Sequence, residues 1–251
     1  MKEISVIIPV YNDFEVIPAL YDRLSQVLIA LNLSYEILFV DDGSKDNSIK
    51  ALLELQGRDQ NIKIIEFKRN YGQEEAIAAG LDYSHGSLIV VMDSDLQDRP
   101  EDIPAMLKLM TNTGTLMVIA RRKGNHSPAL RKLIRKIFFL ICNTCTMISH
   151  DPDLGVFRVI DRKALEQVYQ SNIRSGTRLS LFYLYGTEYR IIDLPREQRY
   201  AGKSSYNFFK LSRLAWKRFF FNLSFMKKKA TGLRENPHYV IKRITGGGDD
   251  L

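Results

Sequence analysis

Two aspartates, Asp93 and Asp95, directly follow the apolar run of residues 88–92. Carboxylates that lie close together repel one another, so this pair needs a positive partner. Acids at positions i and i+2 on a turn that leaves a strand are suited to holding one divalent cation, and oxygen ligands favour Mg²⁺ or Mn²⁺. Such a cation usually keeps open positions for substrate phosphates. The spacing therefore predicts a site at which Mg²⁺ or Mn²⁺ holds a phosphate group.

Helix capping is the alternative interpretation of these two acids, since a helix is expected to begin near Pro100. Glu101 and Asp102 serve that purpose better, because proline suits the first turn of a helix and acids suit the positions after it. An Asp-x-Asp pair alone is a weak signal, so its interpretation depends on the rest of the chain.

The first 120 residues alternate between apolar, β-branched runs and segments with helical spacing. We expect strands over residues 4–10, 35–42, 62–67, 87–93 and 115–120. We expect helices over residues 16–31, 44–56, 73–84 and 100–110. Farther along the chain, the pattern predicts helices over residues 129–149, 162–169 and 177–185 and a strand over residues 188–195. Apolar strands that alternate with helices predict an α/β fold with a mostly parallel, Rossmann-like sheet flanked by helices.

Polar residues follow each of the first five expected strands. Ligands of such sheets bind beyond the carboxyl ends of the strands, so we expect these residues to converge at one edge. They are Pro9–Asp13, Asp41–Ser44, Lys68–Gly72, Asp93–Asp95 and Arg121–Lys123. No G-x-G-x-x-G follows the first strand and the chain has no G-x-x-x-x-G-K-[ST], which argues against a dinucleotide-binding domain and a P-loop NTPase.

Six short motifs occur in one order along the chain. They are ISVIIPVYN (4–12), VDDGS (40–44), RNYGQ (69–73), DSDLQDRPED (93–102), GVFR (155–158) and RYAGKSSY (199–206). This series resembles the family 2 glycosyltransferases, which have a GT-A fold. It is most similar to the branch that includes dolichyl-phosphate mannose synthase and bacterial polyprenyl-phosphate glycosyltransferases, and the resemblance covers roughly residues 3–225.

The resemblance implies a metal-dependent hexosyltransferase of polysaccharide biosynthesis. Its donor would be a UDP-, GDP- or dTDP-linked sugar, and its acceptor a polyprenyl-phosphate lipid carrier. Mg²⁺ or Mn²⁺ would stabilise the negative charge that grows on the departing nucleoside diphosphate.

The resemblance also implies roles for individual residues. Pro9, Tyr11 and Asp13 would line the nucleotide, and Asp13 stands where most relatives carry Glu. The full nucleotide-sugar-binding set is Pro9, Tyr11, Asp13, Asp41, Asp42, Arg69, Asp93, Ser94, Gln97 and Arg158. The metal ligands would be Asp93, Asp95 and Gln97, and the catalytic set would be Asp95, Asp153, Arg199 and Lys203. Arg199 and Lys203 lie in a Gly-containing loop that would close over the diphosphate.

One departure from the family pattern concerns the general base. Polyprenyl-phosphate relatives often read D-x-G-D-F-R, whereas this chain has Val156 in place of the second Asp. Asp153 matches the first Asp and remains a candidate. A phosphate acceptor is already ionised near pH 7 and needs little base, so Val156 is compatible with such an acceptor.

Basic residues concentrate in the C-terminal part of the chain. Residues 196–251 hold 13 Lys and Arg against 4 Asp and Glu, a local charge of +9, whereas residues 1–195 hold 23 against 25, a local charge of −2. We therefore expect a GT-A domain over residues 1–206 and a basic, aromatic helical extension with a flexible tail over residues 207–251. Many relatives continue into transmembrane helices here, but the aromatic residues of this chain lie among cations, as in segments that rest on anionic lipid. A helix that packs its aromatic face on the domain is the alternative.

We expect a cytoplasmic globular protein from the sequence. It has 251 residues, 45% hydrophobic and 26% charged, with no apolar run long enough to span a membrane and no signal peptide. Location on the inner face of the cell membrane follows if the basic extension binds lipid. Cys142 and Cys145 have C-x-x-C spacing, but no second pair exists and their surroundings read as an apolar helix, so we interpret them as core residues rather than a redox or zinc site.

The sequence alone does not decide between several possible binding partners. The acceptor phosphate would contact arginines, for which the candidates are Arg121, Arg122, Arg131 and Arg135. A transferase acting on a saccharide or a lipid-linked sugar and a non-catalytic nucleotide-sugar-binding protein are the alternatives, and a homo-oligomer is compatible with the sequence. We do not expect a nucleic-acid partner, because the acidic strand ends would repel its phosphates.

The basic extension predicts reversible docking on anionic membranes. Each cation near such a surface adds about 1 kcal/mol, and this attraction is screened by salt. Aromatic burial adds a part that salt does not remove. We expect the full chain to co-sediment with anionic vesicles better than with neutral ones, and a truncation after Tyr206 to lose this binding. If the full chain stays in the supernatant with both vesicle types at low salt, the membrane docking is refuted.

Overall fold

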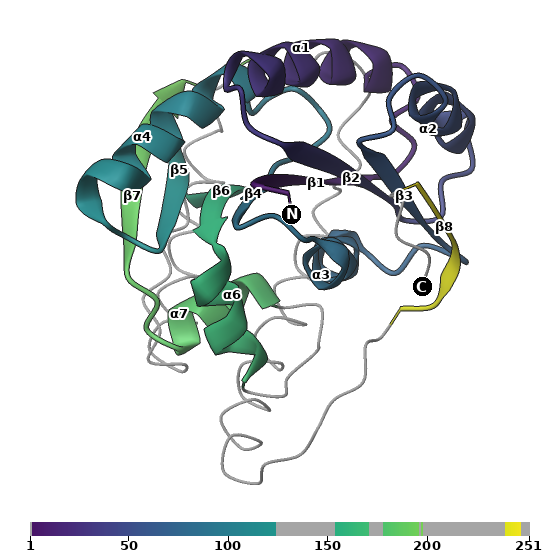
Figure 1. Ribbon diagram of the computed structural model, residues 1–251. Coiled ribbons are helices and arrows are strands. Elements are labelled where there is room, and N and C mark those ends of the chain that lie inside the picture. The colour runs from purple at the N-terminus through teal and green to yellow at the C-terminus, as the bar shows by residue number, and fades with distance from the viewer. Residues whose placement is uncertain (1, 124–153, 171–177, 196, 198–238, 247–251) are drawn as a thin grey trace, which may run out of the picture.

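The computed structural model describes residues 2–123, 154–170, 178–195, 197 and 239–246. These residues form an eight-stranded sheet with helices on both faces (Figure 1). The strand order is β7-β5-β6-β4-β1-β2-β3-β8. The strands are β1 (Ile4–Val10), β2 (Tyr35–Asp41), β3 (Ile62–Phe67), β4 (Leu88–Val91), β5 (Met117–Lys123), β6 (Leu154–Asp161), β7 (Tyr189–Pro195) and β8 (Ile241–Thr245). The helices are α1 (Ile17–Ala30), α2 (Ser48–Gln56), α3 (Gln73–Tyr83), α4 (Ile103–Thr113), α6 (Arg162–Tyr169) and α7 (Arg178–Leu184), and a 3₁₀ turn, η1 (Pro100–Asp102), precedes α4.

The expected α/β fold with a mostly parallel sheet is confirmed. Strands β1, β2, β3 and β4 pair in parallel, and so do β5 and β7. Strand β1 is buried along its whole length, which explains its unbroken apolar run. The carboxyl ends of these strands therefore lie at one edge of the sheet, which we call the site edge.

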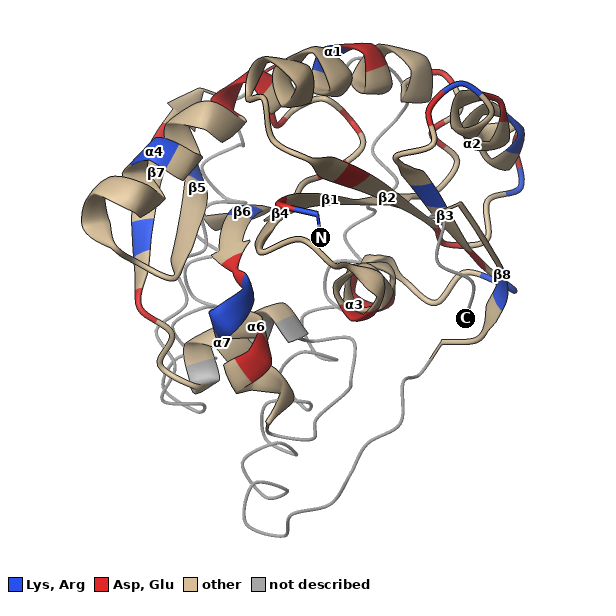
Figure 2. Cartoon of the chain, viewed as in Figure 1, with Lys and Arg blue, Asp and Glu red and all other residues tan. Residues whose placement is uncertain are grey.

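Two apolar layers enclose the sheet. Helices α1, α2 and α4 pack on one face, and α3, α6 and α7 pack on the other (Figure 1). Helix α1 buries a stripe of apolar residues at helical spacing against the sheet, made of Ile17, Leu20, Leu24 and Leu28. Its opposite face carries charged residues of both signs, as Figure 2 shows for this helix. The two layers hold the strands, and hence their ends, in fixed relative positions.

Strand β6 was not expected from the sequence. It runs antiparallel between β4 and β5, with Val91 opposite Arg158 and Arg121 opposite Leu154. Its beginning, rather than its end, therefore lies at the site edge. The antiparallel direction also explains why β5, two positions from β4, still ends at that edge.

Strand β8 corrects the expectation for the C-terminal extension. Residues 241–245 form a strand that pairs antiparallel with β3, whereas a helical extension with a flexible tail was expected over residues 207–251. A strand forms here because the β-branched Ile241, Ile244 and Thr245 fit the open edge of β3. The boundary expected at residue 206 and residues 207–238 lie outside the described part of the chain.

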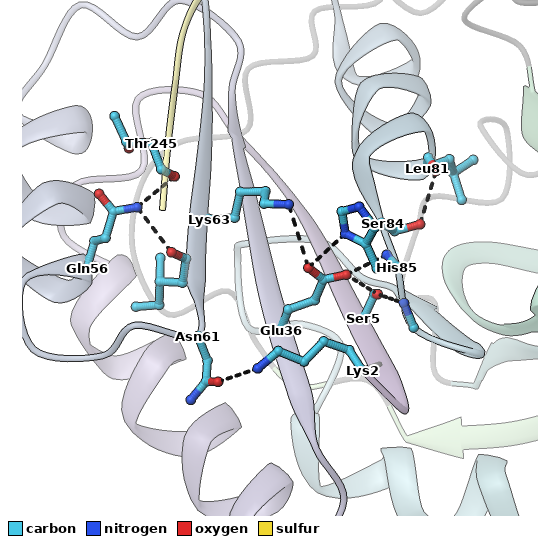
Figure 3. Close-up of polar contacts among 12 residues, drawn as sticks. Lys2, Ser5, Glu36, Gln56, Asn61, Lys63, Leu81, Ser84, His85 and Thr245 are labelled. Atoms are coloured by element: carbon cyan, nitrogen blue, oxygen red, sulfur yellow. Dashed lines mark hydrogen bonds and ion pairs between the residues drawn. The ribbon is translucent and has the colours of Figure 1, made fainter. Parts of the chain in front are cut away.

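The opposite edge of the sheet also holds a buried carboxylate, Glu36, but this one is satisfied within the protein (Figure 3). It accepts hydrogen bonds from Ser5 Oγ and from the His85 backbone N–H, both at 2.6 Å. The Lys63 ammonium lies 3.9 Å from its other oxygen. We therefore assign Glu36 a structural role, in contrast to the acids at the site edge.

Helix α3 approaches β1 so closely that a side chain at Gly80 has no room. A Cβ built there collides with the Ile7 side chain, which is fully buried. We expect Gly80→Ala to lower the free energy of unfolding by about 1–3 kcal/mol, the typical cost of overpacking a core. Urea unfolding measures this change.

Gly57→Ala is the matched control for Gly80→Ala. Gly57 has right-handed helical backbone angles, and an added Cβ meets only ordinary contacts, the nearest at 3.5 Å. We expect this variant to be as stable as wild type or more stable by about 0.4–1 kcal/mol. Equal unfolding free energies for the two variants would contradict the proposed close packing of α3 on β1.

Candidate active site

Asp13 joins the carboxyl ends of β1 and β4. One of its oxygens, Oδ2, accepts hydrogen bonds from Ser94 Oγ at 2.6 Å and from the Tyr11 backbone N–H at 3.2 Å. Its own backbone N–H donates to Ser48 Oγ at 3.0 Å, at the start of α2. The sequence predicted Tyr11, Asp13 and Ser94 as one set, and the structure brings them together.

Asp42 organises the loop that follows β3, residues 68–72, which we call the 68–72 loop. Its carboxylate accepts hydrogen bonds from Asn70 Nδ2 at 2.8 Å and from the backbone N–H groups of Tyr71 and Gly72 at 2.6 and 2.9 Å. Burial raises the pKa of Asp42 to about 6, although the Tyr71 and Gly72 N–H groups oppose this shift. Burial therefore disfavours the ionised form of Asp42, and the hydrogen bonds from the loop only partly offset this effect.

Asp41 is buried beside Asp42 and is less well satisfied. Burial raises its pKa, while the Ser44 N–H, 3.2 Å from Oδ2, lowers it. Among the described residues, its Oδ1 has no hydrogen-bond partner. A buried acceptor without a partner is unusual in a folded protein, and a bound ligand that donates a hydrogen bond would satisfy it.

The turn after β4 carries Asp93 and Asp95 and is held on both sides. Gln73 Nε2, at the start of α3, donates to Asp93 Oδ1 at 2.5 Å, and the Gln97 N–H donates to Asp95 Oδ1 at 3.1 Å. Leu96, between the two contacts, has a left-handed φ of 58° although its side chain is buried. Non-glycine residues adopt this conformation when the surroundings enforce it, and such strain is concentrated at functional sites.

Gln73 is a site residue that the sequence analysis missed. It lies in the RNYGQ motif, which was the available signal, but a glutamine side chain gives no indication of its partner until the strand ends are placed in space. It positions Asp93 by a direct hydrogen bond.

Arg69 lies over the Tyr71 ring, with its guanidinium carbon 5.0 Å from the ring centroid. The backbone of Arg69 also packs against Gly43, where an added Cβ would come within 2.5 Å of the Arg69 carbonyl carbon. Gly43 has a positive φ of 69°, so both its conformation and its surroundings require glycine. This contact joins the end of β2 to the 68–72 loop and places the Arg69 backbone against Gly43, the residue after Asp42.

The predicted arginines differ in their surroundings. Arg121 forms a two-pronged ion pair with Asp193 of β7, at 2.6 and 3.1 Å, so its charge is already partly neutralised. Arg158 is buried in β6 and donates to the carbonyl oxygens of Gly155 and Val156, while its Nη1 has no hydrogen-bond partner in the described part of the chain. Arg122 belongs to β5. Their predicted contacts with ligand stay predictions.

Five predicted residues lie outside the described part of the chain: Asp153, Arg131, Arg135, Arg199 and Lys203. Cys142, Cys145 and the aromatic segment before Tyr239 lie outside it too. Glu197 is described, and its backbone N–H donates to the Gln97 carbonyl oxygen at 3.2 Å. Arg23 of α1 binds the Glu197 carboxylate at 3.0 Å. Glu197, two residues before Arg199, is thus hydrogen-bonded to the turn that follows β4.

The donor set fits a cation that is shared with a ligand. Within the described ranges, no group of three or more His, Cys, Asp or Glu side chains is arranged to hold a metal ion. Mg²⁺ and Mn²⁺ need no such group, since one or two carboxylates together with substrate phosphates suffice. Asp93 and Asp95 would supply those carboxylates, on a turn whose shape is already fixed.

The comparison with protein families agrees with this geometry. The model of the family described as "Glycosyl transferase family 2" matches residues 5–169, which include the ends of β1, β2, β3, β4 and β5. The chain belongs to glycosyl transferase family 2.

Curated relatives of this glycosyltransferase domain are similar over most of its length. It is 34% identical over 217 residues to an undecaprenyl-phosphate 4-deoxy-4-formamido-L-arabinose transferase of Photorhabdus laumondii, which covers 86% of this chain and 66% of the relative. It is 29% identical over 214 residues to the bactoprenol glucosyl transferase of Shigella phage SfV, covering 85% of this chain and 69% of the relative. The chain thus spans about two thirds of the length of these relatives.

Solved structures show the same GT-A fold. The glucosyl-3-phosphoglycerate synthase of Mycobacterium tuberculosis, in complex with Mn²⁺ and UDP, superposes with a TM-score of 0.61 at 17% identity and covers 88% of this chain and 78% of its own. The mannosyl-3-phosphoglycerate synthase of Rubrobacter xylanophilus superposes with a TM-score of 0.62 at 16% identity, covering 94% of this chain and 78% of its own.

Among the helices that the structure describes for the glycosyltransferase domain, none is long and apolar enough to cross a membrane.

The raised pKa of Asp42 predicts a pH-dependent stability. The folded protein holds this proton more tightly than the unfolded chain, so the contribution is present at low pH and is lost as the pH rises through about 6. Asp42→Asn removes the titration. Between pH 7 and pH 5, wild type should therefore gain about 1 kcal/mol of stability relative to the variant. Urea unfolding of both proteins at the two pH values measures the difference, and parallel pH profiles would disprove it.

Proposed function

We propose that this family 2 domain transfers a sugar from a nucleotide-sugar to a polyprenyl phosphate with the help of Mg²⁺ or Mn²⁺. The observation that carries the proposal is the assembly at the site edge. There, Asp13, Asp42 and Asp93 are each fixed by donors from neighbouring strand ends, with Asp95 on the same turn as Asp93.

The acids divide into two groups by their surroundings. Asp41 and Asp42 are buried at the end of β2 and suit the donors of a nucleoside base and ribose. Asp93 and Asp95 lie on the turn after β4 and suit a cation that carries a diphosphate. When bound, that cation would stabilise the charge on the departing nucleoside diphosphate.

The acceptor follows from the relatives and from Val156. Two relatives have names that specify undecaprenyl phosphate or bactoprenol as the lipid on which they act. In this chain, the partly buried side chain of Val156 packs against the apolar layer of α3, α6 and α7 and has no group that could act as a base. An acceptor phosphate is ionised near pH 7, so its oxygen can attack the sugar without a strong base.

The proposed acceptor implies a place at a membrane surface. A polyprenyl phosphate keeps its charged end at the lipid–water boundary, and a peripheral enzyme reaches it from the cytoplasmic side. The basic segment after residue 196 carries the charge for such contact.

Product formation tests the proposal directly. The protein is incubated with Mn²⁺, undecaprenyl phosphate and, in turn, UDP-, GDP- and dTDP-linked hexoses. We expect one donor to give both free nucleoside diphosphate and a glycosylated lipid phosphate. Undecaprenol, which lacks the phosphate, should not be glycosylated.

Asp95→Asn should lower this activity by about 100-fold or more, since removing one charge-stabilising group from an active site typically costs that much. Asp22→Asn makes the same chemical change on the exposed face of α1 and should leave the rate unchanged. Normal activity of the Asp95 variant would refute its role. Absence of lipid product with all donors would refute the polyprenyl-phosphate acceptor.

A further inference from the structure

Tyr239 is the first residue after Glu197 that the structure describes, and it is almost fully buried. Its ring stacks on Phe67, the last residue of β3, with centroids 5.0 Å apart and planes 13° apart. Its hydroxyl donates to Asp82 Oδ2 of α3 at 2.7 Å. Tyr239 thus fills the space between the end of β3 and α3, at the base of the 68–72 loop.

Contacts continue from Tyr239 into that loop. Phe67, the residue on which Tyr239 stacks, also meets the Tyr71 ring edge-on at 5.6 Å. Tyr71 in turn carries the Arg69 guanidinium over its ring, and its backbone N–H donates to Asp42. A backbone hydrogen bond also joins the two segments: the Lys68 N–H donates to the carbonyl oxygen of Val240 at 3.1 Å.

The 68–72 loop needs such support. It enters α3 through Gly72, whose φ of 104° is accessible to few other residues. The N–H groups of Tyr71 and Gly72 and the side chain of Asn70 hold the buried Asp42 carboxylate. A small displacement of the loop would therefore weaken the hydrogen bonds to Asp42 and move Arg69.

We propose that Tyr239 is a positioning residue, which fixes the 68–72 loop through Phe67 and thereby sets Asp42 and Arg69 for the nucleotide. Only the last step, that Asp42 and Arg69 face a nucleotide, rests on the proposed function. The C-terminal segment would then complete the donor site from outside the region that the family model matches.

Strand β8 has its own attachments, so a change at Tyr239 need not detach it. Lys242 and Arg243 both bind the Glu66 carboxylate, at 2.5 and 2.9 Å. These two residues give β8 the basic character seen in Figure 2. At the other end of the strand, Gln56 Nε2 donates to the carbonyl oxygen of Thr245, as Figure 3 shows. The same Nε2 also donates to the carbonyl oxygen of Ile62.

Amide hydrogen exchange tests the positioning role without any ligand. Tyr239→Leu removes the stacked ring, and we expect the Tyr71 and Gly72 amides to exchange about ten-fold faster, since exchange reports local opening. Tyr239→Phe keeps the ring and loses only the hydroxyl, while Asp82 keeps a hydrogen bond from Tyr169 at 3.0 Å. This variant should therefore exchange within about two-fold of wild type.

Tyr189→Leu is the matched control for the loss of a tyrosine ring. Tyr189 begins β7 at the other side of the sheet and at the edge opposite the site, where its ring meets Tyr183 edge-on at 5.5 Å. It should leave the Tyr71 and Gly72 amides unchanged. Unaltered exchange in Tyr239→Leu, or equal acceleration in Tyr189→Leu, would overturn the positioning role.

Calorimetric titration with UDP, GDP and dTDP in Mn²⁺ then connects the loop to the ligand. Tyr239→Leu should weaken whichever nucleoside diphosphate binds wild type by about ten-fold, because misplaced binding groups lose affinity steeply. In turnover, KM for the donor should rise with kcat nearly unchanged. Wild-type affinity in Tyr239→Leu would overturn the link to the nucleotide. Failure of wild type to bind all three nucleotides would instead refute the proposed function, while the exchange experiment still decides the role of Tyr239.

Discussion

Carboxylates at the ends of β1, β2 and β4 are brought close together by the parallel sheet, and they would repel one another without compensation. The neighbouring strand ends supply that compensation as hydrogen-bond donors. Asp13 accepts a hydrogen bond from Ser94, Asp42 accepts hydrogen bonds from the 68–72 loop, and Asp93 accepts one from Gln73. The compensation is incomplete, because burial still raises the pKa of both Asp41 and Asp42. A ligand that carries a cation and hydrogen-bond donors would therefore stabilise these carboxylates.

The arrangement of the sheet makes this concentration of charge possible. Strands that run in one direction end at one edge, so residues far apart in the sequence meet there. The antiparallel β6 fills the space between β4 and β5 and lets both keep that direction. At the opposite edge, Glu36 shows how a buried acid is treated when no ligand is needed, since serine, lysine and backbone donors satisfy it within the protein.

Much of this arrangement could be predicted from the sequence because its signals are local. Apolar runs and helical spacing identified β1, β2, β3, β4 and β5 and the helices between them, and the polar residues after each strand identified the site edge. Strand β6 follows a charged stretch and contains the buried Arg158, so its pattern is not that of an apolar strand. Strand β8 is short and basic, and only the open edge of β3 makes it a strand.

Partners of individual side chains were beyond the sequence for a different reason. Gln73 with Asp93 and Arg121 with Asp193 are pairs between distant segments, and a residue type does not specify its partner. Tyr239 is the extreme case, because it comes from the other end of the chain and stacks on Phe67, the residue before the 68–72 loop. The family resemblance predicted these acids as a group, but it could not show which donors hold them.

The most direct test of the account is the metal dependence of nucleotide binding. The central claim is that Asp93 and Asp95 accept a diphosphate only through a divalent cation. Calorimetric titration of UDP, GDP and dTDP into wild type, with Mn²⁺ and then with excess EDTA, measures this dependence. The account predicts that one of the nucleoside diphosphates binds in Mn²⁺ and that its binding is lost in EDTA. Binding of equal affinity under both conditions would contradict it.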